Sequence, residues 1–392
     1  MTRRKVIIAR SIVYAILTSL PTGDPARKPS ILSRAFRVFR LFWLTFRLVR
    51  PDLFRALRGV WNIKEEDYRA SFGAESIDDS NRSSARKRRR KAKKKDVLQA
   101  MGDMGYSGST FFRTSDGAYL IKSVPRHFEH NFFKNELLLP YAEYMQQNPA
   151  SLLVRITDLL ERTHKSIGEL LGLAPSHHIV MENILYGQDH KSEDGPKKKW
   201  ESWDLKPISY FYPERDVAGG ALATEATKSK LADEFNGKIK LTKAHATQLR
   251  EILEKDTRLL ADRNAVDYSL FLVRISAADE SGPTSQLQLP SVAAGDGQEG
   301  DEPMPPTQPS PSPPNSPTWR TGITSSDATE VYRAAILDFF WAKHTLHAKI
   351  MTGLVQGYNL IDEQGPMSIT AESEEYRERF LKMCMDMVET DE

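Results

Sequence analysis

The sequence predicts an α+β fold in which antiparallel sheets are flanked by helices. The clearest strand signal is the hairpin turn at Asp116–Gly117, which joins the apolar blocks Phe111–Phe112 and Ala118–Ile121. The clearest helix signal runs from Ala244 to Ala261, where leucines and an isoleucine recur on one helical face. The run VYRAAILDFF predicts a short buried strand that ends at Asp338.

The same periodicities predict the other elements. An aromatic stripe at helical spacing predicts a helix that ends at Pro51, followed by a second helix from Asp52 to Trp61; the stripe consists of Phe36, Phe39, Trp43 and Phe46. Such a stripe is typical of a core-facing helix, and an interfacial amphipathic helix is the alternative. Further along, we expect a helix at 128–147, strands at 151–161 and 178–185, a charged loop at 188–199, a strand entered through VDYSLFLVRI, and a closing helix at 376–387.

Length and charge place limits on the class of protein. The 392 residues correspond to about two to three domains. The single cysteine, Cys384, excludes an intrachain disulfide and fits a reducing compartment. The net charge is only +3, yet nine cations are concentrated in one ten-residue run, namely Arg86, Lys87, Arg88, Arg89, Arg90, Lys91, Lys93, Lys94 and Lys95. This run is suited to an anionic membrane, where each cation contributes about 1 kcal/mol; an inert loop and a nuclear-import tract are the alternatives.

No segment of the sequence is expected to span a membrane. The most apolar region, Ala35 to Trp61, is interrupted by six arginines, whereas a spanning helix needs about 20 largely uncharged residues. The N-terminal twenty residues are interpreted as part of the folded protein, because Arg10 splits their apolar core. Residues 277–327 are rich in proline and acidic side chains, and we expect a disordered insertion there.

Four features in chain order match the needs of phosphoryl transfer. A loop of small residues precedes the hairpin and is suited to phosphate binding; it contains Gly105, Ser107, Gly108 and Ser109. Lys122 could neutralise phosphate charge, Asp267 could orient a hydroxyl, and Asp338 could hold Mg²⁺. Taken alone, the loop and hairpin also fit an ordinary hairpin with a Gly/Ser-rich entry. The HRD and DFG triplets of protein kinases are absent from the sequence.

Several segments resemble the phosphatidylinositol phosphate kinase family in a divergent, fungal-type form. They occur in the family's order over nearly all of the foldable chain: LFRALRGVWNIKEEDYRASF, GYSGSTFFRTSDGAYLIKSV, NPASLLVRITDLL, HHIVMENILYG, WDLKP, AVDYSLFLVRIS, VYRAAILDFF and EEYRERFLKM. The resemblance implies a two-lobed lipid-kinase fold of the SAICAR synthase-like kind. It divides the chain into an N-terminal helical part at 1–74, a polybasic loop at 75–104, an N-lobe at 105–185, a C-lobe at 186–276, the insertion at 277–327 and the end of the C-lobe at 328–392.

The resemblance also implies roles for individual residues, with ATP and Mg²⁺ as cofactors. The glycine loop and Lys122 would contact the ATP phosphates, and Met181, Glu182 and Asn183 would form the hinge beneath the adenine. Asp267 would be the catalytic carboxylate, Asp204 and Lys206 would line the cleft, and Asp338 would bind Mg²⁺. The glutamate that pairs with Lys122 is either Glu129 or Glu136, with Glu129 slightly preferred.

The sequence departs from the family pattern in two places. Pro207–Ile208 stands where the family has Gly-Ser, and the lysines that grip lipid phosphates are reduced to Lys343 and Lys349, which are not adjacent. These changes keep two alternatives open: a pseudokinase-like scaffold, and a kinase for another small hydroxyl substrate. The expected partners are a phosphoinositide lipid and an anionic membrane surface, with a homodimer as a further option and no nucleic acid. The expected location is cytoplasmic and peripheral at membranes.

Overall fold

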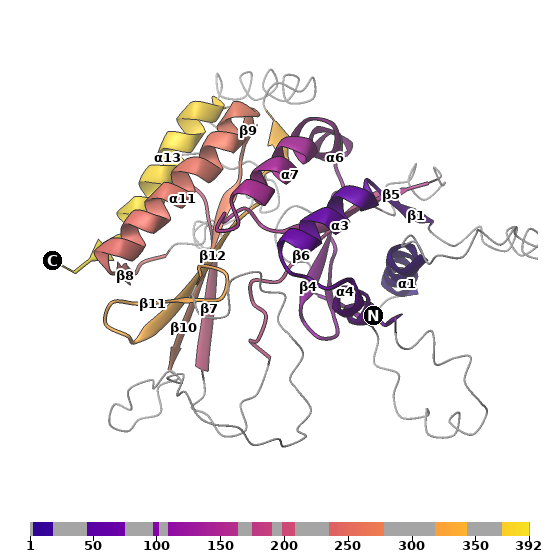
Figure 1. The fold of residues 1–392 in the computed structure, drawn as a ribbon, viewed down its shortest axis with the longest axis horizontal. Coiled ribbons are helices and arrows are strands. Elements are labelled where there is room, and N and C mark those ends of the chain that lie inside the picture. Colours follow the sequence, from indigo (N-terminus) through magenta and orange to yellow (C-terminus); the bar gives the residue numbers. More distant parts are fainter. Residues whose placement is uncertain are drawn as a thin grey trace, which may run out of the picture. The chain divides into compact units, whose positions relative to one another are not determined.

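A computed structural model describes residues 3–18, 45–74, 97–101, 109–163, 175–189, 198–207, 235–277, 318–342 and 371–391 (Figure 1). These residues form two compact units. Unit 1 is drawn from Met1–His127 and Arg155–Asn183, and unit 2 from Phe128–Val154 and Ile184–Glu392. Each unit contains helices and a mainly antiparallel sheet, so the predicted α+β class is confirmed.

Unit 1 is built around a six-stranded antiparallel sheet in the order β1-β5-β6-β4-β3-β2. The strands are β1 (Phe46–Leu48), β2 (Leu98–Ala100), β3 (Phe111–Thr114), β4 (Tyr119–Ser123), β5 (Ile156–Arg162) and β6 (His177–Glu182). The predicted hairpin is confirmed, because β3 pairs with β4 across a turn in which Gly117 has a φ of 79°. Asp116 stabilises this turn, since its Oδ1 accepts a hydrogen bond from the backbone N–H of Ala118 at 3.1 Å.

The helices of unit 1 correct one prediction. They are α1 (Arg3–Thr18), α3 (Pro51–Val60) and α4 (Glu65–Ser71). Phe46 lies in β1 and pairs with Arg162 of β5, so the predicted helical stripe is wrong at its last position; its other three aromatic residues lie outside the described residues. Pro51 does not end a helix but begins α3. Proline is well tolerated there, because the backbone N–H groups of the first helical turn have no acceptor within the helix.

A buried ionic network ties α3 and α4 to β5. The Arg58 side chain is fully buried, and its guanidinium donates to Glu65 Oε1 at 2.6 Å and to the Thr157 carbonyl at 2.6 Å. Asp158 Oδ2 lies 3.3 Å from Arg58 Nη1 and accepts the hydroxyl of Tyr68 at 2.6 Å. Burial nevertheless raises the pKa of Asp158 to about 6, against the opposing pull of Arg58. In the sequence, Arg58 was only one of the arginines that interrupt an apolar region.

Unit 2 contains the predicted helical segment at 128–147, which is confirmed; Asn148 caps its C-terminal end. It comprises α6 (His127–Phe132), a π-helical turn η4 (Phe133–Leu137) and α7 (Leu138–Gln147). The long helix α11 (Lys243–Asp262) and the closing helix α13 (Ser373–Asp386) are also confirmed, and they pack side by side (Figure 1).

Among the helices in the described parts of the chain, we find none with the length and apolar character needed to cross a membrane.

The main sheet of unit 2 has four antiparallel strands in the order β11-β12-β10-β7. They are β7 (Lys198–Leu205), β10 (Ser269–Ala277), β11 (Ile323–Thr324) and β12 (Glu330–Leu337). Two smaller sheets accompany it: β9 (Ala265–Val266) pairs with β13 (Trp341–Ala342), and β8 (Ile239–Leu241) pairs in parallel with β14 (Val388–Thr390). The predicted strands after Val266 and before Asp338 are therefore confirmed. Most of the predicted insertion at 277–327 lies outside the described residues, but the prediction of disorder is wrong for 318–327, which contain the buried Trp319 and strand β11.

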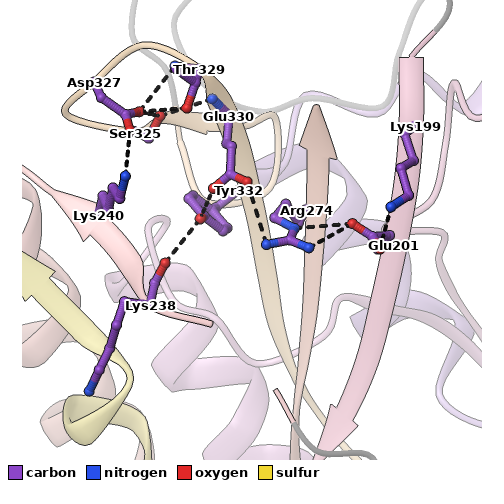
Figure 2. Close-up of polar contacts among 10 residues, drawn as sticks. All are labelled: Lys199, Glu201, Lys238, Lys240, Arg274, Ser325, Asp327, Thr329, Glu330 and Tyr332. Atoms are coloured by element: carbon purple, nitrogen blue, oxygen red, sulfur yellow. Dashed lines mark hydrogen bonds and ion pairs between the residues drawn. The ribbon is translucent and has the colours of Figure 1, made fainter. Parts of the chain in front are cut away.

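At one end of this sheet, polar side chains from neighbouring strands form a network of hydrogen bonds and ion pairs (Figure 2). Arg274 of β10 bonds Glu201 of β7 at 2.8 Å and also pairs with Glu330 of β12, whose carboxylate accepts the hydroxyl of Tyr332. Lys240 pairs with Asp327 at 2.9 Å on the turn before β12. These side chains satisfy one another's charges. They occupy the sheet end at which β7 and β12 begin.

Candidate functional site

The other end of the four-stranded sheet collects three residues that the sequence singled out. Leu205, the last residue of β7, pairs with Leu270 of β10. Ser269, the first residue of β10, pairs with Leu337, the last residue of β12. Because neighbouring strands run antiparallel, the end of β7, the start of β10 and the end of β12 lie at one edge. Lys206, Asp267 and Asp338, which lie just beyond these strand ends, therefore share this edge.

Lys206 and Asp267 form an ion pair at this edge. Lys206 Nζ lies 2.9 Å from Asp267 Oδ2, and each side chain is only 11% exposed. A charge pair with so little solvent is screened far less than a surface pair, so the two groups orient each other strongly. Both residues were predicted for the site, but their pairing was not.

Asp267 and Asp338 have the same unusual backbone geometry. Their φ angles are 65° and 61°, in the left-handed region that side chains other than glycine seldom adopt. On one side of them, β10 pairs with β12; on the other side, Val266 of β9 pairs with Trp341 of β13. Each carboxylate thus marks the point where the chain leaves one sheet for the other. This conformation costs roughly 1 kcal/mol per residue, and such strain is found disproportionately at functional sites.

Asp204, the remaining predicted cleft residue of this unit, lies within β7. It is directly opposite Phe271 of β10 and two residues before Lys206. Pro207–Ile208, which departs from the family pattern, follows Lys206; Pro207 is described, and Ile208 lies outside the described residues.

Lys122 is a buried cation on β4 of unit 1. It pairs with Phe111 of β3 and with Ile179 of β6, and its Nζ lies 5.6 Å from the centroid of the Phe111 ring. Ser109, just before β3, is also buried. Gly105, Ser107 and Gly108 lie outside the described residues, so the predicted phosphate loop stays a prediction.

The predicted adenine hinge is held firmly at the end of β6. Glu182 exchanges two hydrogen bonds with the backbone of Arg155: its N–H donates to the Arg155 carbonyl at 3.0 Å, and its Oε1 accepts the Arg155 N–H at 2.9 Å. Asn183 bonds the β3–β4 turn twice, through its N–H to the Ala118 carbonyl at 3.0 Å and through Nδ2 to the Gly117 carbonyl at 2.7 Å. Met181 is buried and pairs with Leu120.

The remaining predicted residues divide into two groups. Glu129 lies in the first turn of α6 and Glu136 in the π turn η4; both belong to unit 2, while Lys122 belongs to unit 1, so the predicted ion pair stays a prediction. Lys343, Lys349 and the basic run Arg86–Lys95 lie outside the described residues.

The acidic residues at the sheet edge fit a magnesium ion better than a metal held by protein alone. Within the described residues, no cluster of three or more His, Cys, Asp or Glu side chains could hold a metal. Mg²⁺ is usually bound by one or two carboxylates, with substrate phosphates and water as the other ligands. Asp338, with Asp267 at the same edge, matches this donor set.

The structure also shows a carboxylate that the sequence interpretation missed. Asp256 of α11 is fully buried, accepts the hydroxyl of Tyr144 at 2.6 Å and accepts the backbone N–H of Leu152 at 2.6 Å. It thereby ties α11 to α7 and to the segment before β5. A signal was present, because Asp256 lies on the same helical face as Leu249, Leu253 and Leu260, where an unpaired acid would be costly.

An α+β fold whose acidic and basic side chains gather at strand ends suits a phosphotransferase, which works mainly by positioning and electrostatics. The comparisons with known proteins are more specific. The model of the family described as phosphatidylinositol-4-phosphate 5-kinase matches residues 92–387, and the chain belongs to that family. The resemblance noted in the sequence is therefore confirmed.

Individual relatives are distant. The chain is 27% identical over 241 residues to a phosphatidylinositol 4-phosphate 5-kinase of Plasmodium falciparum. The aligned region covers 57% of this chain and 12% of that relative. The chain is 27% identical over 251 residues to a type-1 beta enzyme of Gallus gallus, covering 62% of this chain and 38% of the relative. A relative from the fission yeast Schizosaccharomyces pombe is 26% identical over 140 residues, covering 36% of this chain and 15% of that protein. The chain thus spans well under half the length of these relatives.

Proposed function

We propose that this protein transfers the γ-phosphoryl group of ATP to an inositol-ring hydroxyl of a phosphatidylinositol monophosphate at a membrane surface, with Mg²⁺. We further propose that its α+β architecture is the two-lobed lipid-kinase fold of the SAICAR synthase-like kind. The observation that carries the proposal is the shared sheet edge of Lys206, Asp267 and Asp338 in a member of this kinase family.

Asp267 is proposed to orient the attacking hydroxyl. Its carboxylate is fixed in direction by Lys206 Nζ at 2.9 Å, which makes it a well-placed hydrogen-bond acceptor. A fixed acceptor suits phosphoryl transfer, because the transition state is loose and catalysis depends mainly on positioning. Asp204 precedes Lys206 by two residues on β7 and is proposed to line the same site.

Asp338 is proposed to hold Mg²⁺, which when bound neutralises charge on the ATP phosphates. Its left-handed backbone, with a φ of 61°, is fixed by ladders on both sides. A ligand held in one conformation loses little entropy on binding, so a single carboxylate can contribute usefully to the affinity for Mg²⁺.

Lys122 and the loop from Gly105 to Ser109 are proposed to bind the ATP phosphates, and Met181 to Asn183 to contact the adenine. The burial of Lys122 supports its role, because an ammonium group with little water around it interacts strongly with a phosphate. The rigid attachment of Glu182 and Asn183 to neighbouring backbone supports the hinge, since a flat base binds best to an edge that does not move.

The membrane-binding part of the proposal rests on charge. Lys343 and Lys349 alone provide few cations for a headgroup with several negative charges, and exposed ion pairs contribute only about 0–1 kcal/mol each. The basic run Arg86–Lys95 is proposed to supply the missing attraction to the membrane. Retention of Lys122, Asp267 and Asp338 together favours an enzyme over a pseudokinase-like scaffold.

The test is a lipid panel. Purified protein is incubated with radiolabelled ATP, Mg²⁺ and vesicles that each contain one phosphatidylinositol monophosphate, or unphosphorylated phosphatidylinositol as a control. We expect label in the lipid fraction for at least one monophosphate, and none with Asp267→Asn. If no lipid is labelled while ATP still binds, the scaffold alternative replaces the enzyme. A parallel reaction replaces the vesicles with soluble inositol phosphates, and label transferred only to these would instead support the kinase for a small hydroxyl substrate.

A further inference from the structure

Three consecutive aromatic residues follow Asp338 directly. Phe339, Phe340 and Trp341 are all buried, with exposed fractions of 0%, 6% and 5%. The first two bridge the main sheet and the small one, and Trp341 begins β13. Each of the three side chains packs against a different aromatic ring, so the position of this run is fixed at three points.

Each of the three rings packs against a separate ring of the α6–η4–α7 segment. Phe339 stacks on Tyr141, with ring centroids 5.9 Å apart and an interplanar angle of 28°. Phe340 meets Phe133 edge to face at 5.1 Å and 81°, and Trp341 meets Phe128 in the same way at 4.7 Å and 86°. We call these six side chains the aromatic cluster.

The π turn accounts for the alignment of two of the helix rings. Phe133 and Tyr141 are eight residues apart, a spacing that in an ordinary α-helix leaves the two side chains about 80° out of alignment. A π turn takes up about one extra residue, so the effective spacing becomes about seven, or two full turns. The two rings then lie on one side, with centroids 6.0 Å apart, and Tyr141 is fixed further by its hydroxyl, which donates to the Val154 carbonyl at 2.8 Å.

The residues before Asp338 are held just as firmly. Ile336 donates its N–H to the Leu152 carbonyl at 2.7 Å and accepts the N–H of Val154 at 3.0 Å, while Leu337 pairs with Ser269. Asp338 is therefore a single strained residue between a hydrogen-bonded strand and a run of packed rings. A strained conformation persists only where its surroundings enforce it.

We propose that the aromatic cluster sets the position of the Asp338 carboxylate and thereby the affinity of the site for a divalent cation. This inference rests on the proposed role of Asp338 in holding Mg²⁺. Phe128, Phe133 and Tyr141 are positioning residues, because they touch the segment that carries the ligand and not the cation. Residues that orient a metal ligand typically change metal affinity by about 10- to 100-fold when they are replaced.

The test measures cation binding without turnover. Mn²⁺ is titrated into the full chain in the presence of a non-hydrolysable ATP analogue, and free Mn²⁺ is followed by electron paramagnetic resonance. Phe128→Leu is the first variant, because Phe128 is only partly buried and the change removes the ring but keeps apolar volume. We expect its Mn²⁺ Kd to rise about 10-fold, and Phe128→Tyr, which restores a ring, to return close to the original value.

A matched control lies in the same unit. Phe235 is also partly buried and meets Trp203 edge to face at 4.9 Å and 69°, and within the described residues its ring packs against no member of the aromatic cluster. Phe235→Leu should lower thermal stability as much as Phe128→Leu does and leave the Mn²⁺ Kd unchanged. Phe133→Leu is the second test variant and should also raise the Kd.

The outcomes separate this inference from the proposed function. Unchanged Mn²⁺ affinity in folded Phe128→Leu overturns the inference, and so does an equal loss of affinity in Phe235→Leu. Failure of the wild-type protein to bind Mn²⁺ also overturns it. If the wild type binds Mn²⁺ and Phe128→Leu weakens that binding, the inference stands even when no lipid in the panel is phosphorylated.

Discussion

Replacing Lys206 by methionine removes the ammonium group that faces Asp267 and leaves a nearly buried carboxylate without this partner. The two charged atoms are 2.9 Å apart and each side chain is 11% exposed. Coulomb's law at an effective dielectric constant near 20 gives a gross attraction of about 6 kcal/mol, most of which is offset by the desolvation of both groups. Breaking a buried pair from one side typically costs 3–5 kcal/mol, and the residual exposure here places our expectation at about 3 kcal/mol.

A double-mutant cycle isolates the pair from the rest of the site. Asp267→Asn is the suitable second change, because asparagine tolerates a φ of 65° whereas alanine adds a strain of about 1 kcal/mol. Removing both charges leaves neither one buried alone. The double variant should therefore be more stable than the sum of the single losses predicts, with a coupling energy of about 2 kcal/mol.

The assay is urea unfolding of the four proteins at neutral pH and fixed ionic strength, with equal m-values as the check that the denatured states are comparable. Single losses that add to within about 0.5 kcal/mol would show that the two charges do not depend on each other. Raising the salt concentration should reduce the coupling only slightly, because the pair is shielded from solvent.

Three further changes test other parts of the molecule. Asp338→Asn keeps the left-handed backbone and should abolish Mg²⁺-dependent phosphoryl transfer while the thermal midpoint stays within a few degrees; retained activity would move the metal site elsewhere. Burial raises the pKa of Asp256 to about 6, above its unfolded value of about 3.9, so the folded state holds the proton more tightly and unfolding free energy falls as pH rises from about 4 to 6. Asp256→Asn removes this slope, and its stability relative to wild type should improve by about 2–3 kcal/mol between pH 4 and pH 7 in denaturant titrations; a difference independent of pH would contradict the raised pKa. Replacing the nine cations of Arg86–Lys95 by serine and glycine should release the protein from anionic vesicles in a sedimentation assay, and unchanged binding would rule out the proposed membrane contact.

Local patterns were enough to predict several of the helices and strands of both units. The hairpin at Asp116–Gly117 and the helix from Lys243 to Asp262 were predicted correctly, because turn preferences and the 3.6-residue repeat act over a few neighbouring residues. The stripe that ends at Phe46 misled for the same reason. Helical spacing is a local signal, and pairing of Phe46 with Arg162 of a distant strand outweighed it.

The sequence by itself determined which side chains were candidates for the site, since family motifs and residue chemistry identify Lys206, Asp267 and Asp338. Only the tertiary structure decided that Lys206 pairs with Asp267 and that Asp267 and Asp338 both adopt a left-handed backbone conformation. It also decided that the three rings after Asp338 pack against a helical segment that contains a π turn. Strand register and helix packing decide these contacts. Both depend on residues far apart in the chain, and no local preference encodes where such residues meet.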